Sequence, residues 1–182
     1  MTITNLKRPY CVMDVANAIV QHFMQIQKPI DNQLLQKILY YAQCDYLRRK
    51  EGPLFSEAIY KWGHGPMLPL VYSCFKSYGA APITQTAEYV VTQTKNNKEQ
   101  WILIKPNTRA LAATDQKLIF ALADEIAAQY RQHPFALVRK TRREPMWQRD
   151  YPAIKQDNMQ ITYDNQELST YFQEPNHWPW AN

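Results

Sequence analysis

Histidine and cysteine are the side chains of this sequence best suited to chemistry, because they can bind metals, transfer protons or act as nucleophiles. They occur at scattered positions: His22, His64, His133, His177, Cys11, Cys44 and Cys74. No two of them have the HxH, HExxH or CxxC spacing of a metal or redox site. Motifs of the GxGxxG, P-loop and GxSxG kind are also absent from the sequence. The sequence therefore predicts a protein that is not an enzyme and that uses no metal and no cofactor.

Two of these residues could still act singly. His64 lies in Gly63-His64-Gly65-Pro66, a composition that favours a tight turn over a catalytic histidine. Cys44 follows Lys37 at helical spacing, and a neighbouring cation could lower the pKa of its thiol. No partner with catalytic spacing accompanies it, so a partly buried structural cysteine is the favoured interpretation.

Positive charge gathers at residues 139–143, with the sequence RKTRR. The net charge of +5 and the pI near 9.0 make the chain mildly basic, which alone is a weak sign of nucleic-acid binding. No helix-turn-helix or RNA-binding signature accompanies the run, so a solvated basic face is favoured over a contact with nucleic acid or an acidic protein. Arg139, Arg142 and Arg143 remain candidates for a partner contact.

A polar and aromatic stripe is formed by Gln36, Tyr40 and Gln43, which recur at helical spacing. Two interpretations stay open: an internal hydrogen-bond network beneath a neighbouring element, or an exposed recognition face. Tryptophans are enriched at binding hot spots, but Trp62 and Trp147 are expected in the core. Trp178 and Trp180 in the tail are candidates for a partner surface or a self-contact.

A long helix over about residues 31–51 is expected to position these side chains. Its apolar residues cover most of its circumference, which is typical of a central helix packed on several sides. Asp31 is the expected N-cap, and Gly52-Pro53 ends the helix. Two sets of positions follow from the helical period. The inward face is Leu35, Ile38, Leu39, Ala42 and Tyr46, and the strip expected to face water is Lys37, Cys44 and Arg48.

The remaining elements follow from periodicity and from proline and glycine positions. Further helices are expected over 12–26, from Pro66 to Gly79, over 114–132, over 135 to about 142, and after Asp164, whose spacing to Glu167 is that of a capping box. The non-helical segments are a β-hairpin over about 87–105, an extended segment at 57–62, a turn at 143–147 and a short strand at 159–163.

These elements predict a mainly α fold, a compact helical domain around the central helix with a small β-hairpin. Because a lone hairpin is marginal in water, it should lie against the helices or pair with residues 57–62. We expect one domain over residues 1–182, with its core at about 12–172. The aromatic tail at 173–182 is expected to be flexible or ordered by a partner.

The N-terminal stretch MTITNLKRPY has no apolar signal region, and no apolar run reaches membrane-spanning length. An odd, scattered set of cysteines does not predict a disulfide framework. We therefore expect a cytoplasmic protein with no membrane contact.

Three stretches together resemble a known family. Residues 34–43, LLQKILYYAQ, are similar to its KLQKLLYYAQ helix. Residues 53–76, with Trp62 and Gly65-Pro66, resemble its second segment, "plf…i.aW.yGPv.p.vy..fk". Residues 137–147 resemble its "Ls..tH.e.pW" segment, although Arg142 stands where the family has histidine. The family is the Panacea antitoxin domain, also called SocA-like or phage-associated GepA-like.

This resemblance implies an antitoxin of a bacterial or phage toxin–antitoxin system, which neutralises a separately encoded toxin by direct binding. One founding member delivers its toxin to a ClpXP-type protease, so adaptor activity is a further possibility. The alternative is a nucleic-acid-binding regulator that uses residues 139–143. The residues expected to bind a partner are Gln36, Tyr40, Gln43, Trp62, His64, Arg139, Arg142 and Arg143.

Overall fold

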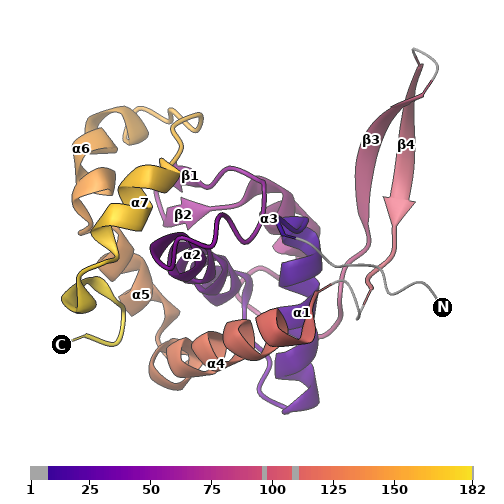
Figure 1. Ribbon diagram of the computed structural model, residues 1–182, viewed down its shortest axis with the longest axis horizontal. Helices are drawn as coiled ribbons and strands as arrows, with labels where there is room; N and C mark the ends of the chain where they lie inside the picture. The colour runs from indigo at the N-terminus through magenta and orange to yellow at the C-terminus, as the bar shows by residue number, and fades with distance from the viewer. Residues whose placement is uncertain (1–7, 96–97, 108–110, 182) are drawn as a thin grey trace.

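The computed structural model describes residues 8–95, 98–107 and 111–181. It is mainly helical, with α2 in the middle and other helices around it (Figure 1). The helices are α1 (Val12–Gln25), α2 (Asn32–Arg48), α3 (Pro69–Phe75), α4 (Ala113–Tyr130), α5 (Pro134–Thr141), α6 (Pro145–Ile154) and α7 (Asn165–Tyr171), with 3-10 turns η1 (Lys76–Tyr78) and η2 (Pro175–His177). The strands are β1 (Tyr60–Trp62), β2 (Gly65–Met67), β3 (Tyr89–Lys95) and β4 (Lys98–Ile104).

The central position predicted for α2 is confirmed. Asp31 caps the helix by accepting a hydrogen bond from the N–H of Leu34. Every residue from Leu34 to Leu47 is buried, because α1, α3, α4, α5, α7 and β2 all contact the helix. The prediction that Lys37 and Cys44 face water is therefore wrong, because both side chains are fully buried.

Two short strands replace the predicted start of the third helix. Pro66 was expected to begin a helix, but it lies in β2, which pairs with β1 in antiparallel register, Lys61 opposite Pro66. The helix begins at Pro69 instead, where the missing N–H would have no helical partner. The predicted strand at 159–163 is reduced to one bridge between Tyr60 and Thr162.

Residues 143–147 were expected to form a turn, but they lead into α6. Pro145 is the first residue of this helix, and the next two residues of the helix, Met146 and Trp147, are buried. Because proline normally breaks a helix, the internal Pro152 makes this helix hard to predict from the sequence.

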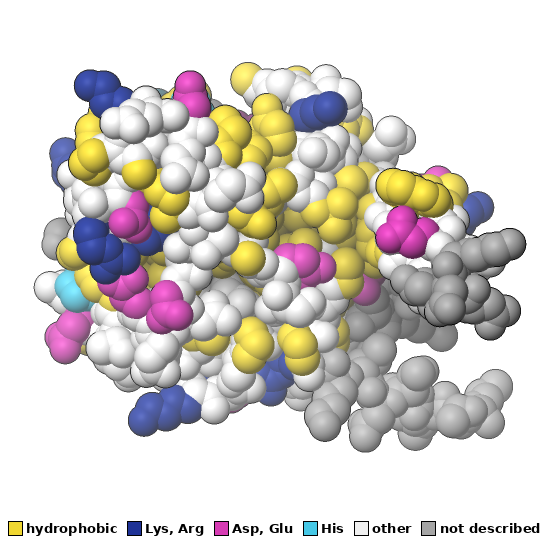
Figure 2. All heavy atoms as spheres, turned by 90° about the horizontal axis from the view of Figure 1, so that it is seen from above, with side chains coloured by type: hydrophobic (Ala, Val, Ile, Leu, Met, Phe, Trp, Pro, Cys, Tyr) yellow, Lys and Arg dark blue, Asp and Glu magenta, His cyan; other side chains and the backbone are white. Residues whose placement is uncertain are grey.

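The predicted hairpin is present as β3 and β4, joined in antiparallel register from Tyr89 opposite Ile104 to Lys95 opposite Lys98. It does not pair with residues 57–62; it projects from the helical body as a separate two-stranded sheet (Figure 1). Among its described residues, Tyr89, Val91 and Ile104 at the base pack on the core. Seen from the end where it projects, the hairpin carries hydrophobic side chains on its surface (Figure 2).

The C-terminal tail packs on the domain, in contrast to the expectation that a partner would order it. Trp178 is buried, donates a hydrogen bond to the carbonyl of Phe172 and stacks on Trp180. Lys140 reaches the carbonyl oxygens of Pro179 and Ala181, at 3.0 and 2.8 Å. The tail thereby covers one side of α2 and α5.

Gly65 makes a close approach possible between β2, α2 and α5. Its φ is +86°, and a Cβ atom there would lie 2.5 Å from Oγ1 of the buried Thr141 and 3.4 Å from Lys37. Both the backbone conformation and the space favour glycine. By contrast, a Cβ atom at Gly63 would meet nothing within 4 Å.

We therefore predict that Gly65→Ala lowers the free energy of unfolding by about 1–3 kcal/mol. The matched control Gly63→Ala should change it by less than about 0.5 kcal/mol. Urea unfolding followed by circular dichroism measures both. Equal stabilities of the two variants would contradict the close approach described at Gly65.

Candidate partner-binding surface and the polar strip beneath it

Four polar side chains of α2, which we call the polar strip, each hold a different segment of the chain: Gln36, Lys37, Tyr40 and Gln43. The Oε1 atom of Gln36 accepts the N–H of Leu68 at 2.8 Å. The ammonium group of Lys37 donates to the carbonyl of Pro66 at 3.0 Å. These two bonds fix β2 and the entry to α3 against α2.

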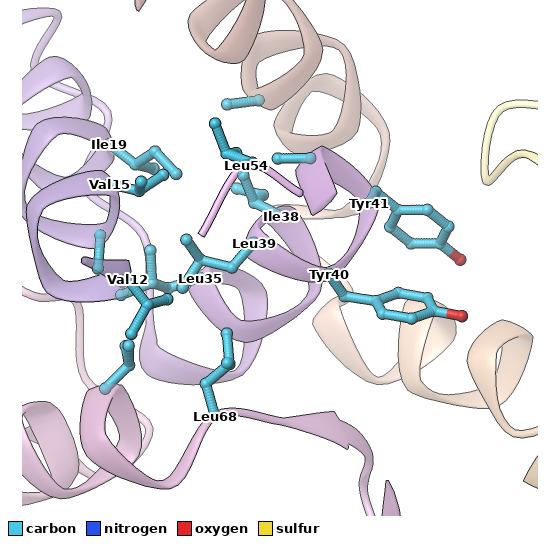
Figure 3. Packing of buried hydrophobic residues seen from close by; sticks show 14 of the residues in the cluster. Val12, Val15, Ile19, Leu35, Ile38, Leu39, Tyr40, Tyr41, Leu54 and Leu68 are labelled. Carbon is cyan, nitrogen blue, oxygen red and sulfur yellow. The ribbon is translucent and has the colours of Figure 1, made fainter. Parts of the chain in front are cut away.

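The other half of the polar strip holds the loop after α2 and the start of α6. Gln43 accepts the N–H groups of Leu54 and Phe55 at 2.8 and 3.2 Å and donates back to the carbonyl of Phe55. The hydroxyl of Tyr40 donates to the Glu144 carboxylate at 2.6 Å. Tyr40 points away from the aliphatic side of α2, where Leu35 and Leu39 meet α1 (Figure 3).

The sequence left open whether Gln36, Tyr40 and Gln43 form an internal network or an exposed face. Each is at most 1% exposed, and each has a hydrogen-bond partner within the protein. They form an internal network, although Gln36 also reaches the wall of a surface pocket. A buried polar group without a partner is costly, so each bond also fixes where its segment lies.

A carboxyl and an ammonium group of this network are both buried. Burial raises the pKa of the Glu144 carboxyl to about 8, opposed by the hydrogen bond from Tyr40 and by the charges of Lys37 and Lys61. Burial lowers the pKa of the Lys37 ammonium to about 7, opposed by the charges of Glu144 and Asp31.

A second set of contacts ties β1 to α6. The buried ammonium of Lys61 donates to the carbonyl of Met146 at 2.9 Å and pairs with Asp150 at 2.5 Å. The indole of Trp147 donates to the carbonyl of Trp62 at 3.1 Å. Trp147 lies in the core as predicted. These bonds join residues 53–76 to residues 137–147, and the bonds of Lys37 and Tyr40 join residues 34–43 to both.

An exposed surface lies over the β1–β2 end of this network. We call it the aromatic–basic face and define it by the half-buried Trp62 and the exposed His64, Tyr72, Phe135 and Arg139. The expectation that Trp62 lies in the core is wrong, because its ring meets the exposed Tyr72. The Trp62 and Tyr72 rings meet edge to face at 5.7 Å, and the His64 and Phe135 rings lie 6.3 Å apart. Tyr72 is 39% and Phe135 55% exposed, and exposed apolar side chains that gather in one place can mark an interaction site.

A pocket of about 300 Å³ opens within the aromatic–basic face. His64, Tyr72 and Phe135 line it together with Met67, and the buried Gln36 reaches its wall. A pocket of this size has room for one large side chain. Trp62 and His64, expected from the sequence to contact a partner, thus come together here, whereas Tyr40 and Gln43 lie beneath.

The basic run does not form a continuous charged stripe. Lys140 is held by the tail, and the guanidinium of Arg142 lies 4.8 Å above the Trp147 ring. Arg139 and Arg143 are exposed. Arg139 is one helical turn after Phe135 on α5, so these two side chains are neighbours on the helix surface.

Sequence reasoning missed Tyr72 and Phe135. Tyr72 is an apolar residue of α3 between the buried Val71 and Phe75, and its exposure depends on which neighbours pack on this helix. Phe135 follows Pro134 at the first turn of a short helix whose other large apolar residues, Leu137 and Val138, are buried. Phe135 is three residues from Val138, so its spacing in the sequence does not separate it from the buried side of the helix.

No group of three or more His, Cys, Asp or Glu side chains that could hold a metal ion occurs within the described residues. Burial raises the pKa of the Cys44 thiol, which removes the activation considered from the sequence. Over the same described part of the chain, no helix is both long and apolar enough to cross a membrane.

Comparison with known proteins gives two matches. The model of the family "Antitoxin SocA-like, Panacea domain" matches residues 35–148, the region that holds both the polar strip and the aromatic–basic face. Antitoxin SocA of Caulobacter vibrioides (strain NA1000 / CB15N) is 37% identical over 73 residues, which are 40% of this chain and 39% of that protein. The match thus spans about two fifths of the length of this curated relative. No solved structure matches the chain.

The Glu144 pKa generates a pH-dependent prediction. Between its ordinary value of 4.5 and about 8, the folded protein holds a proton that the unfolded chain releases, so stability falls as pH rises. For Lys37, between about 7 and its ordinary 10.5, the unfolded chain holds the extra proton, so stability rises with pH. The two together predict a stability minimum near neutral to mildly basic pH.

Glu144→Gln keeps an acceptor for Tyr40 but cannot ionise. We predict that this variant loses the decrease of the free energy of unfolding with rising pH. In the wild type this decrease amounts to up to about 1 kcal/mol per pH unit between about pH 5 and 8. Urea unfolding across this range measures the slope, with Glu125→Gln on the exposed side of α4 as the control. A wild-type slope retained in Glu144→Gln would exclude Glu144 as its source.

Proposed function

Because the chain belongs to the Antitoxin SocA-like, Panacea domain family, we propose that it is an antitoxin that neutralises a cognate toxin by direct protein–protein binding. The name of the Caulobacter relative is that of an antitoxin, and the matched region of the family covers most of the helical body here. The toxin is a separate protein that this chain binds.

One structural observation supports the aromatic–basic face as the contact surface. Phe135 and Tyr72 are large, exposed and gathered around a pocket, with an exposed arginine beside them. Aromatic residues and arginine are the types that most often dominate binding energy at protein interfaces. The polar strip supports this surface from below by fixing β2 and α3, which carry Met67 and Tyr72.

The basic run favours a toxin surface with acidic groups near an apolar anchor. Arg139 lies one turn from Phe135, so a carboxylate of the toxin could pair with it while an apolar side chain enters the pocket. A bound toxin could be blocked directly or delivered to a ClpXP-type protease. The half-life of the toxin in cells with and without that protease distinguishes the two routes.

A nucleic-acid-binding regulator is the alternative. It is weakened by the engagement of Lys140 with the tail and of Arg142 with Trp147, which leaves two of the four basic residues of the run exposed. Phosphate contacts release counterions, so binding to operator DNA would weaken steeply with salt. A steep salt dependence that is lost in Arg139→Glu would favour this alternative.

We predict that co-expression of the chain restores growth to cells that express the toxic product of a neighbouring gene. Phe135→Ala and Arg139→Glu should each weaken toxin binding about tenfold or more, because truncating an interface anchor typically costs that much. Calorimetry with purified toxin measures the affinity, and circular dichroism checks folding.

Lys117→Glu is the matched control for Arg139→Glu, since Lys117 is exposed near the start of α4, far along the chain from the face. It should bind toxin like the wild type. If no neighbouring product is toxic, the antitoxin proposal fails. If the toxin binds but Phe135→Ala and Arg139→Glu match Lys117→Glu, the proposed surface fails while the function stands.

A further inference from the structure

The β3–β4 hairpin has features that binding through the aromatic–basic face does not explain. Its outward side carries Val90, Trp101 and Leu103, which are 45%, 76% and 55% exposed. In the described part of the chain the hairpin is a sheet of two strands, so the outer edge of each strand is unpaired. Exposed apolar edge strands are sites where another chain can add to a sheet.

The sequence of β4 and the residue after it is self-complementary in one antiparallel register. Alternate residues point to the same side, so Glu99, Trp101, Leu103 and Lys105 share the outward side, and all four are exposed. If two copies of β4 pair around a two-fold axis at Ile102, Glu99 of each copy lies opposite Lys105 of the other. Trp101 then lies opposite Leu103.

Each of these pairs stabilises an antiparallel sheet, because opposite charges and aromatic–aliphatic pairs attract across strands. A two-fold axis repeats each pair, so the contact would contain two charge pairs and two apolar pairs. The register centred on Trp101 instead places Glu99 opposite Leu103. On β3, residues 89–93 offer no pair of opposite charges, so the β4 edge is the self-complementary one.

We propose that two copies of this chain associate through their β4 edges, antiparallel and centred on Ile102, to form a four-stranded sheet. The outward sides of both hairpins then make one continuous apolar strip, with Val90 beside Leu103 in each copy. The aromatic–basic face belongs to other elements, β1, β2, α3 and α5, so the two surfaces are separate in the chain. This proposal does not depend on toxin binding.

Charge exchange tests the register. Sedimentation equilibrium of the wild type over a range of protein concentrations should fit a monomer–dimer equilibrium. Glu99→Lys and Lys105→Glu each turn two attractions into two repulsions, so each should weaken the dimer about tenfold. Glu125→Lys on α4 is the matched control and should leave the dimer unchanged.

Two restorations make the test specific. The double variant Glu99→Lys/Lys105→Glu should dimerise like the wild type. An equimolar mixture of the two single variants should form a heterodimer. In it, the lysine introduced at position 99 of one copy faces the glutamate introduced at position 105 of the other, and the original Lys105 and Glu99 face each other. A wild type that stays monomeric throughout overturns the proposal, and so does a loss that neither the double variant nor the mixture restores. Circular dichroism of each variant confirms that the helical body is unchanged.

Discussion

The burial of polar side chains on α2 is the constraint on which the rest of the structure depends. Gln36, Lys37, Tyr40 and Gln43 lie inside the protein, where an unpaired polar group costs a large part of a domain's stability. Their partners come from Leu68, Pro66, Glu144 and the loop at Leu54 and Phe55. Apolar packing alone would tolerate a shift of these segments, whereas directional bonds to fixed atoms do not. The polar strip therefore specifies how the chain returns to its central helix.

This arrangement separates scaffold from surface. The stretch LLQKILYYAQ contains the polar strip, so its polar residues serve the interior, and Gly65 is required by the close approach of Lys37 and Thr141. In our proposal, the contact with a toxin is made by side chains that the scaffold holds outward, among them His64 and Phe135. Because buried residues specify the fold, such exposed residues can be substituted without loss of the architecture. Under this proposal, binding specificity and folding rest on different residues in this chain.

Local signals in the sequence were enough to predict much of the fold. Asp31 and Asp164 cap helices as expected, and the alternation around residues 87–105 predicts the hairpin. The errors arise where a distant partner decides. Lys37 is buried because its ammonium meets the carbonyl of Pro66, 29 residues away. The tail packs because Lys140 donates to its carbonyl groups and the carbonyl of Phe172 accepts the indole N–H of Trp178, contacts that no local pattern indicates. For the proposed site, Trp62 and His64 were suggested by the sequence and stay a prediction, whereas the exposure of Tyr72 and Phe135 depends on how α3 and α5 pack.

Amide hydrogen exchange of the chain with and without its toxin tests the central claim most directly, because it reports on the surface and the interior in one measurement. The account predicts new protection at residues 62–72 and 134–139 in the complex. It also predicts that amides of α2 exchange slowly in both states, because the polar strip already holds them. Protection confined to β3 and β4 or to α1, with residues 62–72 and 134–139 unchanged, would contradict it.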